Sequence, residues 1–310
     1  MGIYLGIDTS NYTTSAALYD SGTGNVRMEK KLLPVPKGKI GLKQSDAVFH
    51  HVRQLPEVLE QLYGGKKPVL DGIGVSAMPR RQSGSYMPCF LTGKLAAKSA
   101  AFAAGVPLYE FSHQEGHIMA ALFSAGKMDF LDEEFYAFHI SGGTTECLLV
   151  RYEDKQFQIQ LLSRSLDLKA GQAVDRVGAM LGLPFPAGPE LDTLSRKSGD
   201  IVEKVRPCLK GLDCSLSGLE NQCKALLGNG VPREYIAKYC IMFILETVSA
   251  MTQAVFQKYG EKHVLYAGGV MSNSMIRQEL AARFGGFFAE PAYSSDNGAG
   301  AAILAAKASA

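Results

Sequence analysis

The chain has 310 residues, of which 46% are hydrophobic and 20% are charged, and its formal net charge is +2. This composition excludes a disordered chain, and the length is natural for two lobes rather than for one compact domain. The small net charge neither requires nor excludes a nucleic-acid partner, because the placement of charges matters more than their sum.

The cysteines and the N-terminal segment indicate the cellular compartment in which the protein is expected. No two of the six cysteines form a C-x-x-C pair, so buried reduced thiols are expected and a zinc knuckle or dithiol site is disfavoured. The N-terminal segment, MGIYLGIDTS, has no basic region followed by a long apolar stretch. We therefore expect a cytoplasmic protein without a membrane span.

The first elements are expected to form a β-hairpin. Two apolar runs of strand length, residues 3–7 and 14–19, flank a short polar turn, and residues 26–33 offer a third strand. Helices are expected next, over residues 46–63, where apolar positions have helical spacing, and over the Ala-rich residues 92–104.

A second hairpin pattern occurs farther along the chain. In residues 136–152, YAFHISGGTTECLLVRY, an apolar strand meets a turn of small polar residues and is followed by another strand. This segment can be laid over GIDTSNYTTSAALY near the N-terminus, which indicates two lobes of related topology. Chance similarity of two hairpins is the alternative.

Helices and strands alternate in the remainder, which gives an α/β class. Residues 236–259 are apolar on most sides and predict a buried helix, and residues 263–266 predict a short strand. Two further helices are expected over residues 273–284 and 299–308.

The expected division has three parts. Residues 1–108 form an N-terminal lobe, and residues 109–292 form a C-terminal lobe. Residues 293–310 supply a last loop and a helix that packs back toward the N-terminal lobe.

A pair of histidines is the first candidate for chemistry. His113 and His117 are four residues apart, so on a helix both rings lie on one face and can bind one metal ion. Two buried core histidines are the alternative. Glu115 lies midway between them, roughly 200° around the helix from each, and cannot serve as the base of an H-E-x-x-H peptidase. Asp296, before the last helix, is either a helix cap or a third ligand.

Turns of small residues are candidates for binding a phosphate or a sugar. The turn Ser141-Gly142-Gly143-Thr144 offers unobstructed backbone N–H groups, although hairpins use such turns freely. Gly268-Gly269 precedes Asn273, whose amide could bind a base or ribose edge. Asp175 lies on an apolar helix face and needs a partner, which is either Arg176, Arg164 or a ligand hydroxyl.

Several motifs occur in a fixed order over nearly the whole chain: GIDTS, SHQEGH, ISGGTT, AGQAVDRVGAMLGLPFPAGP, LSGL, AGGVMSN and SSDNGA. Together they resemble the motifs of the TsaD family, the tRNA threonylcarbamoyladenosine synthases formerly called O-sialoglycoprotein endopeptidases or glycoproteases. The resemblance implies a two-lobed actin/Hsp70-like ATPase (ASKHA) fold, with a duplicated β-hairpin-containing core and an interlobe cleft.

The resemblance also implies the site residues and the reaction. A divalent metal ion, iron or zinc, would be bound by His113, His117 and Asp296. Contacts with the substrate or nucleotide would come from the Gly-rich turns and three polar side chains: Ile140, Ser141, Gly142, Gly143, Thr144, Asp175, Gly188, Asp192, Gly268, Gly269 and Asn273. The family moves a threonylcarbamoyl group from an adenylate to the adenosine next to the tRNA anticodon. An adenine nucleotide or adenylate is thus the implied ligand. The implied partners are tRNA and other proteins of this pathway or a paralogous subunit.

The chain departs from the family pattern at several positions. The family has S-C-D-E-T after its first strand, where this chain has Ser10-Asn11-Tyr12-Thr13-Thr14. The histidine of V-S-G-G-H-T is Thr144 here, the lysine of S-G-L-K is Glu220, and residues 78–90 replace a shorter apolar loop. Asp8 is the nearest remaining carboxylate and is the candidate catalytic residue.

Two interpretations follow from these departures. The chain is either a carbamoyl-type acyltransferase acting on tRNA, or a catalytically weak or inactive regulatory paralogue that keeps both ligands and acts through protein partners. A peptidase is disfavoured by the position of Glu115, and a sugar kinase would need a general base for which Asp8 is the candidate.

Basic residues of the first lobe could form a rim for tRNA phosphates, with solvated surface charge as the alternative. These residues are Lys37, Lys39, Lys43, Arg80 and Arg81.

Overall fold

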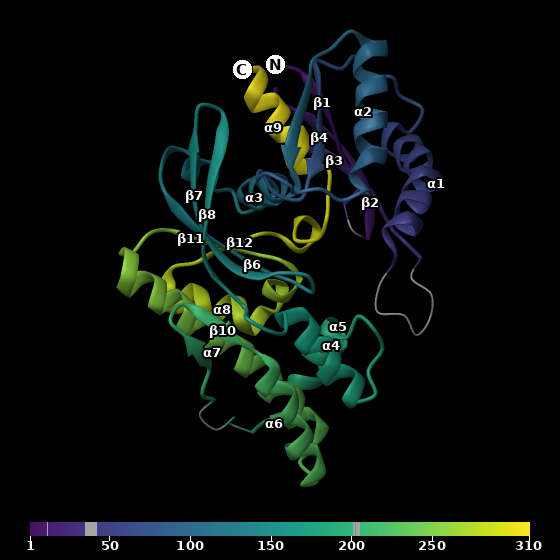
Figure 1. Cartoon of the computed structure of the whole chain (residues 1–310). Helices are drawn as coiled ribbons and strands as arrows, with labels where there is room; N and C mark the ends of the chain where they lie inside the picture. The colour runs from purple at the N-terminus through teal and green to yellow at the C-terminus, as the bar shows by residue number, and fades with distance from the viewer. Residues whose placement is uncertain (11, 35–41, 201, 203–204) are drawn as a thin grey trace. The chain divides into compact units, whose positions relative to one another are not determined.

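The computed structural model describes residues 1–10, 12–34, 42–200, 202 and 205–310. These residues form two compact units, each with a five-stranded sheet (Figure 1). Unit 1 comprises Met1–Ser124 and Ala292–Ala310, and unit 2 comprises Ala125–Pro291.

Unit 1 is built on a mixed sheet whose strand order is β3-β2-β1-β4-β5. The described strands and helices of this unit are β1 (Ile3–Asp8), β2 (Thr13–Asp20), β3 (Asn25–Leu32), α1 (Gln44–Tyr63), β4 (Gly72–Met78), α2 (Phe90–Ala104), β5 (Leu108–Ser112), α3 (His113–Ser124) and α9 (Ala299–Ser309). Strands β1 to β3 are antiparallel, whereas β4 and β5 run parallel to β1. The carboxyl ends of β1, β4 and β5 therefore meet at one edge of the sheet, where Asp8 and His113 lie.

Helices pack on both faces of this sheet. Leu5 and Ile7 point to the face that α1 and α2 cover, and Gly6 between them points to the other face. A Cβ atom on Gly6 would lie 2.1 Å from the carbonyl oxygen of Gly298, and one on Gly74 would lie 2.0 Å from that of Ala301. Glycine at these two strand positions therefore allows the backbone of α9 to pack directly on the sheet.

The same kind of contact joins α9 to α3. A Cβ atom on Gly300 would lie 1.9 Å from the carbonyl oxygen of Gly116, so the two helices cross at backbone distance. This crossing brings the first turns of α3 next to the loop that precedes α9.

Unit 2 repeats the strand arrangement of unit 1. Its described elements are η1 (Met128–Asp132), β6 (Phe135–Ile140), β7 (Thr145–Glu153), β8 (Gln156–Arg164), α4 (Ala170–Met180), α5 (Gly188–Ser195), β9 (Cys208–Lys210), β10 (Asp213–Ser215), α6 (Ser217–Gly228), α7 (Arg233–Tyr259), β11 (Val264–Ala267), η2 (Gly269–Ser272), α8 (Ser274–Phe284) and β12 (Phe287–Phe288), and η3 (Pro291–Tyr293) follows at the unit boundary. The main sheet has the order β12-β11-β6-β7-β8. An antiparallel meander is again extended by two parallel strands, which confirms the expected α/β class and the duplicated hairpin core.

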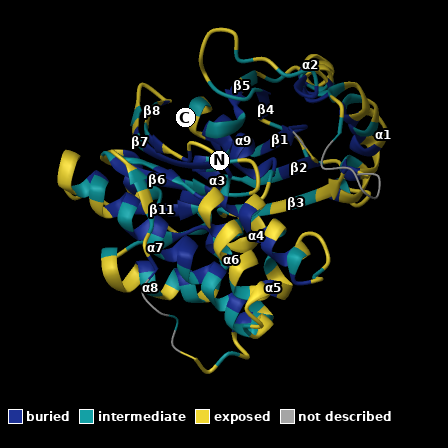
Figure 2. Cartoon of the chain, turned by 60° about the horizontal axis from the view of Figure 1, so that its bottom comes forward, coloured by how far each residue is buried: buried dark blue, intermediate teal, exposed yellow. Residues whose placement is uncertain are grey.

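Helix α7 is the main core helix of unit 2. Among the described residues it is the one helix that is long and apolar enough to cross a membrane, yet 61% of its most apolar 18-residue window is buried inside the protein. Its Phe243, Ile244 and Met251 side chains are almost fully buried in the core. Figure 2 shows buried stretches along α7. This burial is typical of the core helix of a globular domain, as the sequence predicted.

The division into units differs from the one expected from the sequence. Residues 109–124, expected in the C-terminal lobe, belong to unit 1, because β5 pairs with β4 and α3 packs against α9. Residues 293–310, which were expected to pack toward the N-terminal lobe, belong to unit 1, where α9 packs on β1 and β4.

Candidate functional site

Three potential metal ligands meet in unit 1. His113 and His117 lie on the first turns of α3, and Asp296 lies in the loop before α9. The Nε2 atoms of the two histidines are 2.9 Å apart, and they lie 3.5 and 3.4 Å from Oδ1 of Asp296. The structure thus brings together three residues that are far apart in the sequence.

The spacing of these three donors fits a single metal ion. With metal–ligand bonds of about 2.1 Å, neighbouring donors in an octahedral or tetrahedral site lie about 3.0–3.4 Å apart. Two imidazoles and one carboxylate suit zinc or ferrous iron, and three protein ligands leave positions open for water or a ligand.

The loop that carries Asp296 is held by its neighbours. Lys30 on β3 donates hydrogen bonds from Nζ to the carbonyl oxygen of Ala292 and to Oγ of Ser295, at 2.8 and 2.7 Å. Oδ1 of Asn297 accepts a hydrogen bond from the N–H of Ala299 at the start of α9. Asn297 therefore binds the first N–H of α9, and the Asp296 carboxylate faces the histidines.

Asp8 contacts this cluster through His113. Its Oδ2 atom lies 2.8 Å from Nδ1 of His113 and accepts a hydrogen bond from Oγ of Ser76 at 2.6 Å. Its Oδ1 atom accepts hydrogen bonds from the N–H of Ser10, at 2.7 Å, and from the Ser10 hydroxyl. The roles of Ser10 and Ser76 were not predicted, although both follow from their positions at the carboxyl ends of parallel strands.

The electrostatics of the cluster favour a cation. Burial alone would raise the pKa values of Asp8 and Asp296, but the charge of His113 and its hydrogen bonds lower both pKa values overall. Burial lowers the pKa of His113, yet the charge of Asp8 and the contacts with Asp296 raise it to about 10. Two ionised carboxylates thus face the imidazoles, an environment that attracts a proton or a metal ion.

Glu115 stabilises the start of α3. Its Oε2 atom accepts a hydrogen bond from the N–H of Ser112 at 2.7 Å, while the Ser112 hydroxyl accepts one from the N–H of Glu115 at 3.2 Å. This reciprocal pair is a capping box. Nε of Arg81 also donates to both carboxylate oxygens of Glu115. Glu115 is thus a buried structural residue, and the guanidinium of Arg81, which was expected in a tRNA rim, is held by it.

The candidate ligand-binding turns of unit 2 lie at one edge of its sheet. The Ser141–Thr144 turn follows β6 and the Gly268-Gly269 turn follows β11, and these two strands are parallel neighbours. Gly268 has a φ of +102°, and a Cβ atom there would lie 2.3 Å from the carbonyl oxygen of Ile140. The N–H of Gly171 in the first turn of α4 donates to the carbonyl oxygen of Ser141. Backbone N–H groups and a helix N-terminus therefore gather where α/β sheets usually bind ligands.

Three polar side chains of unit 2 lie on the helices beside these turns. Asn273 donates from Nδ2 to Oδ1 of Asp192 at 2.7 Å, and its Oδ1 atom caps α8 by accepting from the N–H of Ile276. Asp175 accepts a hydrogen bond from the N–H of Ala187, directly before Gly188. Burial raises the pKa of Asp175, and this hydrogen bond offsets only part of the effect.

The hydrogen-bond partner of Asp175 differs from the arginine that the sequence offered. Arg176 was a possible partner, but its guanidinium pairs with Glu220 at 2.9 Å. The partner that the structure gives Asp175 is the backbone of Ala187.

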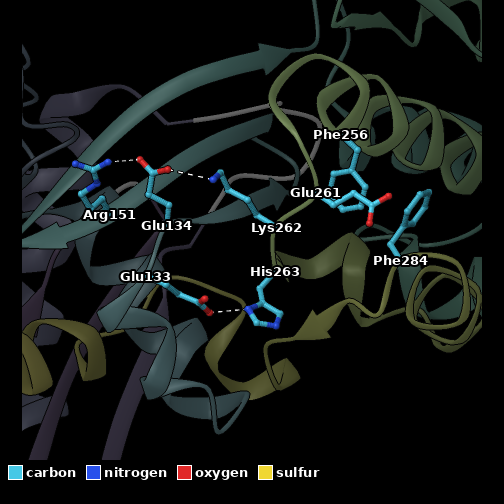
Figure 3. Close-up of a pocket in the computed structure, with 8 residues that line it drawn as sticks. All are labelled: Glu133, Glu134, Arg151, Phe256, Glu261, Lys262, His263 and Phe284. Atoms are coloured by element: carbon cyan, nitrogen blue, oxygen red, sulfur yellow. Dashed lines mark hydrogen bonds and ion pairs between the residues drawn. The ribbon is translucent and has the colours of Figure 1, made fainter.

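A surface groove of unit 2 lies at the opposite edge of the sheet (Figure 3). It has a volume of about 630 Å³ and adjoins the amino ends of β6 and β11. Arg151, Glu134 and Lys262 form a chain of ion pairs along it, and Glu133 pairs with His263. These five charged side chains therefore satisfy one another, and the groove is remote from the predicted ligand-binding turns.

The chain also matches a known protein family. The TsaD family, described as tRNA N6-adenosine threonylcarbamoyltransferase, matches residues 36–303. The chain belongs to the TsaD family. The match covers most of the chain and confirms the resemblance inferred from its motifs.

Solved structures place this TsaD-family chain in the actin-like ATPase fold. HypF from T. kodakarensis has a TM-score of 0.61 at 15% identity, over 97% of this chain and 46% of HypF. The activator of the 2-hydroxyisocaproyl-CoA dehydratase from Clostridium difficile, with bound ADPNP, has a TM-score of 0.53 at 14% identity, over 98% and 94% of the two chains. A ROK family glucokinase from Streptomyces griseus, in complex with glucose and AMPPNP, has a TM-score of 0.54 at 13% identity, over 99% and 100%. At these identities the likeness establishes the fold alone.

The departures from the TsaD pattern can be located in the structure. Tyr12 is 40% exposed and Thr13 is buried at the start of β2, where the family has its two acids. Thr144 closes the turn after β6, because its N–H and carbonyl oxygen both bond to Ser141. Glu220 forms ion pairs with Arg176 and Lys224. Lys37 and Lys39 of the expected tRNA rim lie outside the described residues.

Proposed function

We propose that this TsaD-family protein binds an adenine nucleotide or adenylate through unit 2 and a divalent iron or zinc ion through unit 1. We further propose that it transfers a threonylcarbamoyl or related carbamoyl group to the adenosine next to the tRNA anticodon. The observation that carries this proposal is the geometry of His113, His117 and Asp296, whose donor spacing suits one metal ion. Membership of a family of threonylcarbamoyltransferases supports the transfer reaction.

The residues have distinct roles in this proposal. The N–H groups of Gly142 and Gly143 would bind a phosphate, because both residues are exposed and carry no side chain. The half-buried carboxylate of Asp175 would accept a hydrogen bond from a ribose hydroxyl. A metal ion held by His113, His117 and Asp296 would supply Lewis-acid stabilisation of phosphate oxygens.

A regulatory paralogue with weak or no activity is the second candidate function. It is favoured by Tyr12 and Thr13, which stand where the family has Asp and Glu, because neither is a useful base near neutral pH. Asp8 does not replace the missing acids in this reading, since four donors of the described residues already occupy its carboxylate. Such a protein would keep nucleotide and metal binding and act through a paralogous subunit or other proteins of the pathway.

A single-turnover assay separates the two functions. The purified full-length chain is mixed with threonylcarbamoyl-adenylate and unmodified tRNA, and the modified nucleoside is measured with and without candidate pathway proteins. Transfer supports the acyltransferase, whereas its absence under both conditions, with nucleotide binding retained, supports the regulatory paralogue.

Calorimetry with ATP, ADP and AMP tests the ligand, and Asp175→Ala should bind more weakly than the wild type. Equal affinity in Asp175→Ala would contradict the proposed nucleotide contact. A cytosolic location, where tRNA is modified, belongs to the same proposal.

A further inference from the structure

Asp8 ends the central strand of unit 1, and its side chain is almost fully buried. Its carboxylate is 2% exposed, and strands β2 and β4 flank the strand that carries it. A buried carboxylate requires hydrogen-bond donors, because desolvation otherwise disfavours its charge. The donors that surround Asp8 therefore determine what it can do.

Donors of the described residues occupy both oxygens of this carboxylate. Ser10 supplies two of them to Oδ1, and Ser76 and His113 supply one each to Oδ2. An ionised carboxylate has about four lone-pair positions. With four donors in place, Asp8 has no vacant position from which to accept a proton from a substrate.

The contact with His113 selects one form of the imidazole. Because Nδ1 lies 2.8 Å from Oδ2 of Asp8, the Nδ1–H donates to the carboxylate. In the neutral ring Nε2 then carries the lone pair. That atom is the one that faces Nε2 of His117 and Oδ1 of Asp296. Hydrogen bonds of this kind between a carboxylate and a metal-binding histidine fix the tautomer and the ring orientation.

We propose that Asp8 is a positioning residue, which holds His113 in the tautomer and orientation that bind the metal ion, and that it is not the base of the reaction. Ser10 and Ser76 in turn fix the Asp8 carboxylate, so the chain of contacts runs from two strand ends to the metal-facing nitrogen. This inference rests on the proposed metal site of unit 1, and it assigns a role to Asp8 that does not depend on the acceptor substrate.

The test is a titration of the chelator-treated full-length protein with Co²⁺, followed by calorimetry and by visible absorption. We expect Asp8→Asn to bind Co²⁺ about 10–100-fold more weakly than the wild type and with an altered spectrum, because the amide presents a donor to Nδ1. Asp20→Asn, which changes a partly exposed carboxylate at the far end of β2, is the matched control and should bind as the wild type does. Ser76→Ala removes one donor but leaves the contact with His113, so a smaller loss is expected.

The outcomes distinguish this inference from the proposed function. A wild-type chain that binds no Co²⁺ overturns both. A wild type that binds Co²⁺ together with a folded Asp8→Asn variant of equal affinity and unchanged spectrum overturns the positioning role alone. If Asp8→Asn does not fold, ¹⁵N NMR of the wild-type histidines in the presence of Zn²⁺ decides: His113 should carry its proton on Nδ1, and a proton on Nε2 would refute the inference.

Discussion

The ion pair between Arg81 and Glu115 allows a quantitative test of what holds α3. The Glu115 side chain is 2% exposed, whereas that of Arg81 is 42% exposed. Replacing Arg81 with Met removes the two hydrogen bonds of Nε to Glu115, of 3.1 and 3.2 Å, and the 3.3 Å hydrogen bond of Nη2 to the carbonyl oxygen of Glu110. Among the described residues, the N–H of Ser112 is then the remaining donor to the buried Glu115 carboxylate. Breaking a fully buried pair costs about 3–5 kcal/mol. Because Arg81 is partly solvated, we expect Arg81→Met to lower the free energy of unfolding by a smaller amount, about 1–3 kcal/mol.

A double-mutant cycle isolates this contribution. Glu115→Gln keeps an oxygen that can accept from Ser112, so the capping box survives while the buried charge is removed. Arg81→Met should therefore cost less, about 0.5–1 kcal/mol, when Glu115 is already Gln, because chiefly the exposed hydrogen bond to the carbonyl oxygen of Glu110 is then lost. Urea unfolding followed by circular dichroism gives the free energies, and hydrogen exchange in α3 shows whether unit 1 is the part that opens. An equal loss in the Glu and Gln backgrounds would show that Arg81 acts through other contacts, and our account of the ion pair would be wrong.

Two further predictions concern packing. Gly300→Ala should lower the melting temperature, because its Cβ atom would lie 1.9 Å from the carbonyl oxygen of Gly116, although alanine has the higher helix propensity by about 1 kcal/mol. Gly199→Ala is the control, because a Cβ atom there would have no atom within 4 Å. An unchanged or higher melting temperature for Gly300→Ala would refute the close crossing of α3 and α9. A thiol reagent at neutral pH should label the native protein once, at the exposed Cys208, because the other five cysteines are buried. Burial also raises the pKa of four of these thiols, those of Cys147, Cys214, Cys223 and Cys240. Mass spectrometry of the native Cys208→Ser variant should show no rapid labelling, and fast reaction of a second thiol would contradict the packing of the core.

Elements that stand out as apolar runs were predicted well. The expected strands at residues 3–7 and 14–19 correspond to β1 and β2, and the helix expected at residues 236–259 is α7. β4 was missed, because its sequence GIGVSAM is buried on both faces and does not alternate between apolar and polar residues. β5 was taken for a lobe boundary, since five residues between two helices resemble a linker when their partner strand is unknown.

The candidate site was predictable only where spacing carries information. The i,i+4 spacing of His113 and His117 is local, and Ser112 with Glu115 also has the S-x-x-E pattern of a capping box, which the sequence offered and our prediction did not use. The contacts of Asp8 with Ser76 and of Lys30 with Ser295 join residues 68 and 265 positions apart. Contacts of this kind depend on which strands become neighbours, and no local pattern encodes that.

The glycines at which α9 crosses the sheet and α3 have a consequence for interpreting natural variants. Gly6, Gly74 and Gly300 are not among the proposed metal- or nucleotide-binding residues, yet each faces a carbonyl oxygen at a distance that excludes even a methyl group. In a mutational scan they should be as intolerant as the histidines, but for expression and folding rather than for metal content. A homologue that keeps these glycines and has lost His113 or Asp296 would therefore have inherited the scaffold without the metal chemistry. Sequence surveys that score the two groups of positions separately can distinguish such descendants from working enzymes.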